Sequence, residues 1–322
     1  MHAIQIDGDE LKWSPYEATP CGAGEVRIAV AATAINRADL VQRSGGYPPP
    51  PGASPIMGLE CAGEVLEIGE GVQRVAIGER VCALLAGGGY ASEVVVPAGQ
   101  VLPMPENLSF AEAAAIPEVF ATAYLNLYLE GALQPGERVL LHAGASGVGT
   151  AAIQLLLQTD NPCFVTVGGA DKVERCVALG AQGGFDRHQA SFKEAVTEWA
   201  GDGGVDLILD PVGASYLTDN LSVLGLNGRL VLIGLMGGAQ QEINLAALMM
   251  KRLRVIGSTL RARPVAEKAR VMDALHQDLW PALASGAIKP IIETTFSIQA
   301  TAEAHALVAS NDTFGKVVLT ID

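Results

Sequence analysis

The 322-residue sequence has no uninterrupted apolar stretch approaching the roughly 20 residues that a membrane helix needs. The segment Met1–Glu10 carries acidic side chains where a secretory signal has basic residues followed by an apolar run. Basic residues are also scarce, with 21 Lys and Arg against 35 Asp and Glu, and the formal net charge is −14. Such a charge repels phosphate backbones at long range. We therefore expect a cytoplasmic protein with no membrane span and no nucleic-acid partner.

Cysteine is rare, and its spacing does not match a disulfide framework or a common metal motif. The five cysteines form no C-x-x-C pair and are odd in number. They are Cys21, Cys61, Cys82, Cys163 and Cys176. The simplest interpretation is buried, reduced thiols.

The most informative stretch is Arg138–Gln154, RVLLHAGASGVGTAAIQ. Residues 138–142 predict a buried strand, and the small and apolar residues after the glycines predict the start of a helix. Glycines let the backbone turn tightly and approach a ligand, and a helix N-terminus favours an anion such as pyrophosphate. The residues predicted to contact the pyrophosphate are Gly144, Ser146, Gly147, Val148 and Gly149. The alternative is a tight turn without a ligand, since the spacing is G-x-x-G-x-G rather than G-x-G-x-x-G.

The pattern of elements changes near residue 118. Before it, alternating segments predict an antiparallel, partly barrel-like sheet with strands at 25–34, 59–68 and 80–85. After it, apolar runs alternate with helical segments, which predicts a parallel, doubly wound sheet. Its strands are expected at 138–142, 163–167, 205–209, 230–233 and 253–256, with a helix over 171–179. The terminal segment Lys316–Ile321 predicts a strand that could rejoin the first sheet.

Three local features complete this outline. Residues 36–40 predict a short helix between the first strands, and Pro117 predicts a break in the helical region that begins near Ser109. The segment Ser44–Gly52 contains four consecutive prolines, which cannot donate to a sheet and hold an extended, stiff loop.

Seven motifs together resemble a known family. They are AINRADL, GGYPPPPG, GLECAGEV, AAAIPEVFATAY, LLHAGASGVGTAAIQL, LILDPVG and LIGLMGG. In this order they resemble the zinc-independent quinone oxidoreductases of the medium-chain dehydrogenase/reductase superfamily, closest to the tumour-suppressor-inducible branch, with zeta-crystallin as a more distant relative. The resemblance implies an α/β protein with a GroES-like, β-rich catalytic domain (1–118), a Rossmann NADPH-binding domain (119–260) and a C-terminal segment (261–322) that completes the catalytic domain. It also implies a homodimer.

Zinc-dependent members of that superfamily carry cysteine and histidine ligands that this chain lacks. Asn36 stands at the first ligand position, and the G-H-E position has the sequence Gly58-Leu59-Glu60. No cluster of His or Cys at ligand spacing remains, so we expect no metal site.

The end of the second Rossmann strand bears on the choice between NADPH and NADH. Gly168 and Gly169 follow the strand where NAD enzymes place an acidic residue for the ribose. The resemblance implies that Lys172 binds a 2′-phosphate and that Arg187 replaces a tyrosine near it. Against this, Lys172 could be a solvated surface residue, Arg187 a surface arginine, and Asp171 could cap the helix or favour NAD.

The resemblance also implies three residues near the substrate. Tyr47, on the proline-rich loop, and Asn36 are predicted to donate hydrogen bonds to a carbonyl oxygen that gains negative charge. Ser146 is predicted near the phosphate or the carbonyl. Helix capping by Ser146 and a packing role for Tyr47 remain the alternatives.

Further cofactor contacts are predicted at the turn after the strand 230–233. There the resemblance implies that Gly234, Leu235 and Met236 lie beside the nicotinamide, together with Leu260. Met236 could instead belong to the core. His142, inside an apolar strand, predicts a buried and hydrogen-bonded imidazole rather than a catalytic base.

These observations predict an NADPH-dependent reductase that transfers a hydride to a quinone or a similar conjugated carbonyl without zinc. Two alternatives stay open: an enoyl-thioester or enone reductase, and an NADPH-binding protein with little turnover.

Overall fold

The computed structural model describes residues 1–8 and 10–321, and the chain divides into two compact units. The first unit comprises Met1–Ala121 and Leu260–Asp322, and the second comprises Thr122–Thr259. The sequence placed these divisions after residues 118 and 260. Asp322, the last residue of the predicted C-terminal segment, lies outside the described residues.

The first unit is built on an antiparallel sheet that its C-terminal strands extend. Its strands are β3 (Glu25–Ala34), β4 (Glu60–Ile68), β5 (Arg80–Leu84), β6 (Glu93–Pro97), β7 (Val101–Pro103), β14 (Ile292–Ser297) and β15 (Lys316–Thr320). The order is β14-β15-β3-β4-β5-β7, and β6 also pairs with β3. Alternate residues of β3 are buried, as the sequence pattern predicted. A separate hairpin is formed by β1 (His2–Asp7) and β2 (Glu10–Pro15).

The terminal strand confirms that the unit is discontinuous in sequence. β15 runs antiparallel to β3, with Val318 opposite Ala34 and Thr320 opposite Ala32. β14 lies parallel on the other side of β15. The end of the chain therefore sits against the segment that leads into Asn36.

Three short helices and one long helix, α9, belong to this unit. They are α1 (Arg37–Arg43), α2 (Phe110–Ala114), α9 (Val265–Ser285) and α10 (Thr301–Ser310). Ser109 caps α2 with its hydroxyl on the Glu112 N–H, and Glu112 returns a hydrogen bond to the Ser109 N–H. Pro117 begins a new helix, α3 (Pro117–Tyr124), which confirms the predicted break. A π-helical turn over Leu125–Glu130 follows.

The second unit is a doubly wound α/β domain. Its strands are β8 (Val139–His142), β9 (Cys163–Val167), β10 (Gly183–Asp186), β11 (Val205–Asp210), β12 (Leu224–Leu232) and β13 (Arg254–Gly257). They pair in parallel in the order β10-β9-β8-β11-β12-β13. This is the order of a dinucleotide-binding fold, in which the strand sequence reverses beside the first strand.

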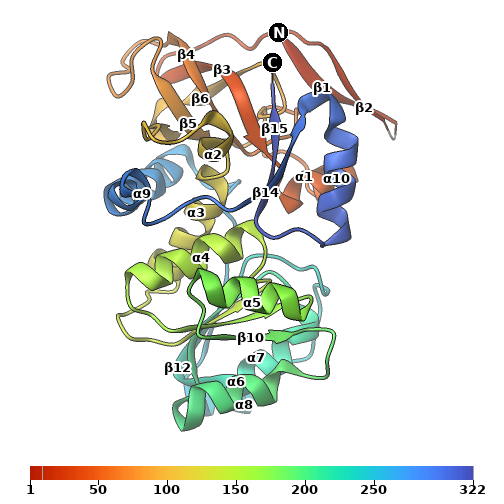
Figure 1. Cartoon of the computed structure of the whole chain (residues 1–322), viewed down its shortest axis with the longest axis vertical. Coiled ribbons are helices and arrows are strands. Elements are labelled where there is room, and N and C mark those ends of the chain that lie inside the picture. Colours follow the sequence, from red (N-terminus) through yellow and green to blue (C-terminus); the bar gives the residue numbers. More distant parts are fainter. Residues whose placement is uncertain (9, 322) are drawn as a thin grey trace. The chain divides into compact units, whose positions relative to one another are not determined.

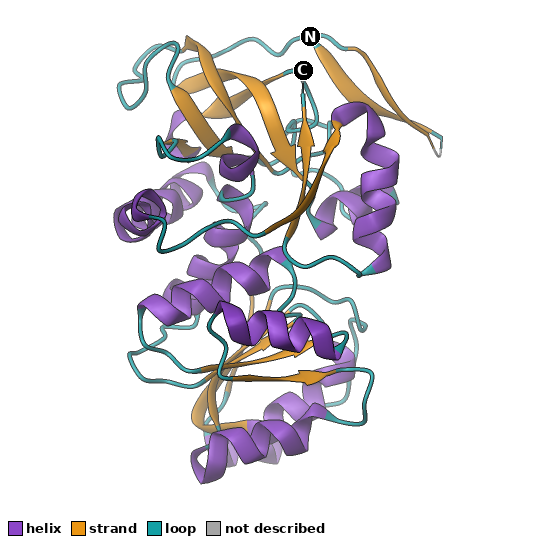
Figure 2. Cartoon of the chain, in the orientation of Figure 1, coloured by secondary structure: helices purple, strands orange, loops and turns teal. Residues whose placement is uncertain are grey.

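Helices cover both faces of this sheet. They are α4 (Gly147–Gln158), α5 (Ala170–Leu179), α6 (Phe192–Ala200), α7 (Leu217–Val223) and α8 (Leu245–Lys251). Figure 1 shows α4 and α5 over one face and α6, α7 and α8 over the other, and Figure 2 shows the alternation of helix and strand that produces these layers. All four residues of β8 are buried, as expected for a central parallel strand. The carboxyl end of β8 therefore lies at the point where an open α/β sheet binds ligands.

Among the described residues, no helix combines the length and the apolar character that a membrane crossing requires.

Candidate functional site

The glycine turn after β8 leads directly into α4. Ser146 is the N-cap of this helix, and its Oγ accepts a hydrogen bond of 3.1 Å from the Gly149 N–H. The capping alternative for Ser146 is thus realised, but it uses only the hydroxyl oxygen as an acceptor. Within the part of the chain that the structure describes, the hydroxyl hydrogen has no acceptor, so Ser146 can cap the helix and donate to a ligand at the same time.

Two glycines of the turn are required by the protein's own packing. A Cβ at Gly149 would lie 2.5 Å from the carbonyl oxygens of Ala143 and Gly144, and a Cβ at Gly144 would lie 2.6 Å from the Val165 side chain. These contacts hold the start of α4 close to the end of β8. The first N–H groups of the helix, at Gly147 and Val148, then face outward without an intrahelical partner, as an anion site requires.

The end of β9 lies beside an arginine and a histidine side chain. A Cβ at Gly168 would meet the Arg187 Nε at 3.0 Å and the His188 Cε1 at 3.1 Å. Both side chains follow β10, which pairs with β9 in parallel. Asp186 fixes this corner because its Oδ1 accepts from the Gly169 N–H at 2.9 Å and lies 3.1 Å from the His188 Nδ1. His188 was not anticipated, since only the pairing of β10 places it beside Gly168.

Lys172 does not lie on the solvated surface. Only 6% of its surface is exposed, on the buried side of α5. The alternative interpretation of a surface lysine is therefore wrong, whereas Arg187 and His188 are exposed at the end of the strand. Asp171 stands beside Gly169, with its Oδ1 2.6 Å from the position of a Cβ there. The 2′-phosphate role of Lys172 stays a prediction.

The turn after β12 packs on the loop that follows β11. The Met236 N–H donates to the Pro211 carbonyl at 3.2 Å, and a Cβ at Gly234 would lie 2.8 Å from the same oxygen. Leu235 and Met236 are both exposed, so Met236 is not a core residue. Leu260, the first residue of the C-terminal part of the other unit, is buried. The predicted nicotinamide contacts of all four residues remain predictions.

His142 is buried and bonded on both nitrogens, as predicted. Its Nδ1 lies 2.8 Å from the Thr166 Oγ1, and its Nε2 lies 2.7 Å from the Asn220 Oδ1. The Asn220 amide donates to Asp210, so its oxygen accepts from the imidazole Nε2–H. Burial lowers the pKa of His142 to about 4 and raises the pKa of Asp210 to about 6. This chain of bonds ties the ends of β8, β9 and β11 together.

We expect the His142→Gln variant to be less stable than the wild type at neutral pH, and we expect this difference in stability to shrink as the pH falls. In the wild type the folded state holds His142 neutral. The contribution of this neutral imidazole to stability is therefore complete above about pH 6.5 and is lost as the pH falls toward 4. The glutamine side chain of the variant does not titrate. The difference in the free energy of unfolding between wild type and variant should therefore shrink by up to about 3 kcal/mol over this range. Urea denaturation at a series of pH values measures it, and a constant difference would contradict the prediction.

In the first unit, Asn36 belongs to a buried polar cluster with Glu60 and Lys316. The Lys316 ammonium donates to the Asn36 Oδ1 at 2.7 Å and lies 2.8 Å from the Glu60 Oε1. The Asn36 amide donates to the same Glu60 oxygen at 3.0 Å. Only 4% of Lys316 and none of Glu60 is exposed. The remaining Glu60 oxygen accepts from the Glu118 N–H at 2.9 Å, which seats the start of α3.

This cluster engages the whole Asn36 amide. Its oxygen accepts from Lys316, and its two hydrogens point to Glu60 and, at 3.3 Å, to the Ala34 carbonyl. A hydrogen bond from Asn36 to a substrate would require one of these bonds to break, so its donor role remains a prediction. Asp39 supports the arrangement, because its carboxylate accepts from the Asn36 N–H at 2.8 Å and from the Gly58 N–H at 3.0 Å.

The same cluster bears on zinc. The Lys316 ammonium donates to oxygens of Asn36 and Glu60, and a metal ion bound to these oxygens would have to displace that cation. Residues 1–8 and 10–321 contain no group of three His, Cys, Asp or Glu side chains that could hold a metal ion. The donor set therefore does not fit a zinc centre.

Tyr47 lies half-buried on the proline-rich loop. The Arg261 guanidinium stands over its ring, 5.1 Å from the centroid. No residue among those that the structure describes bonds to the Tyr47 hydroxyl, which leaves it available to donate. Burial raises the pKa of Tyr47 above its usual range, so the phenol remains protonated at neutral pH.

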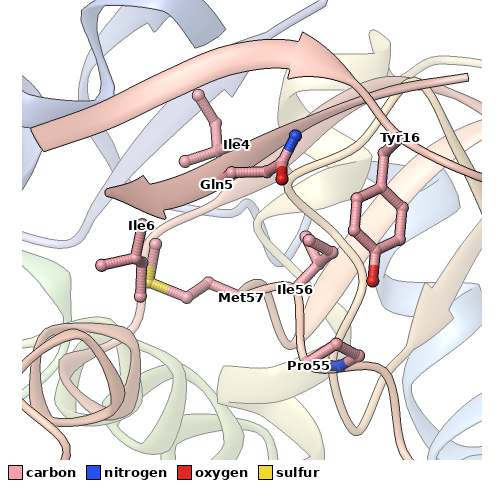
Figure 3. Close-up of a pocket in the computed structure, with 7 residues that line it drawn as sticks. All are labelled: Ile4, Gln5, Ile6, Tyr16, Pro55, Ile56 and Met57. Atoms are coloured by element: carbon pink, nitrogen blue, oxygen red, sulfur yellow. The ribbon is translucent and has the colours of Figure 1, made fainter. Parts of the chain in front are cut away.

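Two cavities lie apart from these residues. One, of about 200 Å³, lies between β1 and residues 55–57, and Figure 3 shows its mixed lining. It is lined by Ile4, Gln5, Ile6, Tyr16, Pro55, Ile56 and Met57. The Gln5 amide is already bonded to the Ser14 Oγ and the Pro15 carbonyl. The other, of about 570 Å³, lies beside α7 and the segment 241–247 of the second unit. Neither is lined by a predicted site residue.

Comparison with family models matches both units. The model of the alcohol dehydrogenase GroES-like domain matches residues 22–106, and the model of zinc-binding dehydrogenases matches residues 179–319. The quinone oxidoreductase-like protein 2 homolog of Nematostella vectensis is 30% identical over 303 residues, covering 92% of this chain and 82% of the relative. Highly-reducing polyketide synthase 1 of Aureobasidium melanogenum is 31% identical over 315 residues, covering 97% of this chain. The chain spans only 14% of that synthase.

Solved structures of two kinds superpose on the whole chain. Escherichia coli quinone oxidoreductase complexed with NADPH has a TM-score of 0.88 at 28% identity, covering 99% of this chain and 98% of that structure. The CurK enoyl reductase has a TM-score of 0.86 at 27% identity, covering 100% and 99%. The expected combination of a GroES-like domain and a Rossmann-like parallel sheet is thereby confirmed.

Proposed function

Because the chain belongs to the medium-chain dehydrogenase/reductase superfamily, an oxidoreductase family with an NAD(P)-binding fold, we propose that it is an NADPH-dependent reductase of quinones and similar conjugated carbonyls. The observation that carries the proposal is the pair of hydrogen-bond donors without acceptors. One is the Ser146 hydroxyl at the α4 N-terminus, and the other is the Tyr47 hydroxyl on the proline-rich loop. The first suits a phosphate and the second suits a carbonyl oxygen.

The residues of the second unit suit NADPH. The N–H groups that open α4 and the Ser146 hydroxyl would bind the pyrophosphate. The exposed Arg187 beside Gly168 would bind the 2′-phosphate, since a guanidinium forms bidentate bonds to phosphate. Gly168 and Gly169 carry no acidic side chain at the end of β9, although Asp171 and Asp186 both lie close to Gly169, so Arg187 would have to outweigh their charge. The NADPH complex of the Escherichia coli homologue supports the same choice.

The chemistry that we propose needs no metal. Bound NADPH supplies a hydride to the acceptor, and a proton from water completes the two-electron reduction of a quinone to a hydroquinone. Tyr47 would donate a hydrogen bond to the acceptor oxygen as negative charge develops there. Its raised pKa keeps the phenol protonated for this role. The Glu60–Lys316 pair holds the start of α3.

An enoyl-thioester reductase is the second candidate, and the similarity to the CurK enoyl reductase favours it. Both reactions add hydride to a carbonyl-conjugated acceptor, so the same donor could serve either. Turnover of NADPH with 1,4-naphthoquinone and with a crotonyl thioester separates them. We expect the quinone to react faster. Faster thioester reduction would remove the quinone assignment, and tight NADPH binding without oxidation by either acceptor would indicate a cofactor-binding protein.

We also propose that the protein forms a homodimer through the outer edge of the second unit. Among the described residues, β13 is an edge strand of its sheet. An edge strand presents unpaired backbone N–H and C=O groups that can pair with a strand of another chain. Large apolar side chains are exposed on this strand and on the neighbouring α8, namely Leu245, Met249, Met250 and Val255. A second copy of the chain would cover this patch and pair with the edge.

We expect the Met249→Glu/Met250→Glu variant to be monomeric, because two carboxylates would be buried in the proposed interface without partners. Light scattering coupled to size exclusion measures the mass. The matched control is Leu129→Glu, an exposed apolar residue outside the patch, which should leave the mass unchanged. A wild-type monomer, or a dimer that persists in the double variant, would contradict this interface.

A further inference from the structure

Arg261 is a buried cation whose hydrogen bonds all go to neutral acceptors. Burial lowers its pKa, while Tyr47 and the more distant carboxylates of Asp39 and Glu118 raise it. Only 3% of it is exposed, and it begins the C-terminal segment of the first unit just after Leu260. Its Nε donates to the Ala86 carbonyl at 2.8 Å, and its Nη2 donates to the Gln42 Oε1 at 2.7 Å. No carboxylate of the described residues forms an ion pair with it. Burying an unpaired guanidinium is costly, so a specific role at this position is indicated.

The guanidinium is directed at the proline-rich loop. Its Nη1 donates to the Tyr47 carbonyl at 3.2 Å, while its plane stands over the Tyr47 ring. Gln42 precedes the loop, and its side-chain oxygen accepts from Arg261. Its side-chain nitrogen donates at 3.0 Å to the carbonyl of Pro55, which follows the loop. One side chain therefore contacts the loop at Tyr47 and, through Gln42, links its two flanks.

The loop needs such an external anchor. Gly45 and Gly52 stand near its two ends with φ of 80° and 82°, where glycine tolerates rotation that other residues resist. Between them the four prolines form a stiff segment that moves as one body. A small rotation at the glycines would thus displace the Tyr47 hydroxyl by more than a hydrogen bond tolerates. The bonds from Arg261 oppose that displacement.

Arg261 is itself held from α9. The Lys268 ammonium donates to the Arg261 carbonyl at 3.3 Å. The pKa of Lys268 is lowered, chiefly by burial and also by the Arg261 cation, while Glu118 opposes the shift. Burial raises the pKa of Tyr47, Arg261 lowers it, and Glu118 raises it. The guanidinium therefore makes the phenol a stronger hydrogen-bond donor than burial alone would leave it.

We propose that Arg261 is the positioning residue for Tyr47, fixing both the loop and the orientation of the phenol that donates to the acceptor carbonyl. This inference rests on the proposed function, since Tyr47 is the group that we assign to the acceptor. Arg261 acts through Tyr47 and makes no contact with the acceptor itself.

The first test compares Arg261→Lys with Arg263→Lys, a control two residues away whose guanidinium forms a partly buried pair with Glu267. Lysine keeps the charge but loses the planar fork and the stacking on the ring. For Arg261→Lys we expect kcat with naphthoquinone to fall about ten- to hundredfold while the Kd for NADPH stays the same. Arg263→Lys should match the wild type, and a thermal melt of each variant verifies folding.

A double-mutant cycle with Tyr47→Phe separates positioning from general damage. Without the phenol there is no donor to position, so Arg261→Lys should change kcat less than about twofold in the Tyr47→Phe background. The same fall in both backgrounds would overturn the proposal, as would an unchanged kcat in the single variant.

A spectroscopic readout tests the inference independently of turnover. In protein labelled with fluorotyrosine, the ¹⁹F resonance of Tyr47 is assigned by its loss in Tyr47→Phe, and its titration reports the phenol. Arg261→Met should move the midpoint to higher pH, because the neighbouring cation is gone. An unchanged midpoint overturns the positioning role. If the wild type reduces no acceptor, the proposed function fails. The titration would still show whether Arg261 acts on the Tyr47 phenol.

Discussion

Replacing Lys316 with methionine is expected to lower the free energy of unfolding by about 3–5 kcal/mol. The variant leaves the Glu60 carboxylate fully buried without its ammonium partner, and it also leaves the Asn36 Oδ1 and the Ile35 carbonyl without a donor. Urea denaturation followed by tryptophan fluorescence, to which Trp13 and Trp280 of the same unit contribute, measures the change.

The control for this prediction is Lys12→Met. Lys12 forms ion pairs with Asp7 and Glu10, but all three side chains are largely exposed, so no measurable change in stability is expected. Adding Glu60→Gln to Lys316→Met removes the stranded charge and should restore part of the lost stability. A loss below about 1 kcal/mol for Lys316→Met would mean that the buried pair contributes no more than a surface pair.

Replacing Arg187 with glutamine is expected to raise the Kd for NADPH about ten- to hundredfold and to change the Kd for NADH less than about twofold. A charge-assisted bond to phosphate contributes about 1.5–3 kcal/mol, and NADH has no 2′-phosphate to receive it. Titration of both nucleotides by fluorescence measures the two constants. Equal losses for NADPH and NADH would show that Arg187 does not bind the 2′-phosphate.

Lys172→Met and His188→Gln are the companion variants. Lys172 is buried on α5, so its replacement should affect folding more than the choice of nucleotide. His188 lies beside Arg187 over Gly168, and its loss should weaken NADPH binding less than the loss of Arg187. If Lys172→Met weakened NADPH selectively, the lysine rather than the arginine would be the group that binds the phosphate.

The apolar runs of the sequence determined the central strands. β9 has the predicted bounds 163–167, and β3 has the predicted bounds 25–34. Both signals are local: a run of apolar residues between turns in one case, and strict alternation in the other. The turn at Gly144 and the break at Pro117 could also be predicted, because glycine and proline restrict the backbone wherever they stand.

β10 could not be predicted in this way. Its residues Gly183 and Gly184 are typical of a turn, yet they pair with β9. The side chains of Phe164 and Val165 leave no space for a Cβ at these positions, which explains why glycines stand there. This strand brings Arg187 and His188 to Gly168. The signal that places His188 at that corner therefore lies in strand pairing, not in the local sequence.

The sequence by itself determined the central strands, the turns and the lack of cysteine and histidine at the zinc-ligand positions. These features depend only on each residue and its neighbours along the chain. Only the tertiary structure decided which polar groups satisfy one another. Lys316 reaches Asn36 from 280 positions away, and Arg261 reaches Tyr47 across 214. Such contacts form because a buried charge must find a partner in space, and no local pattern records which partner the fold brings near.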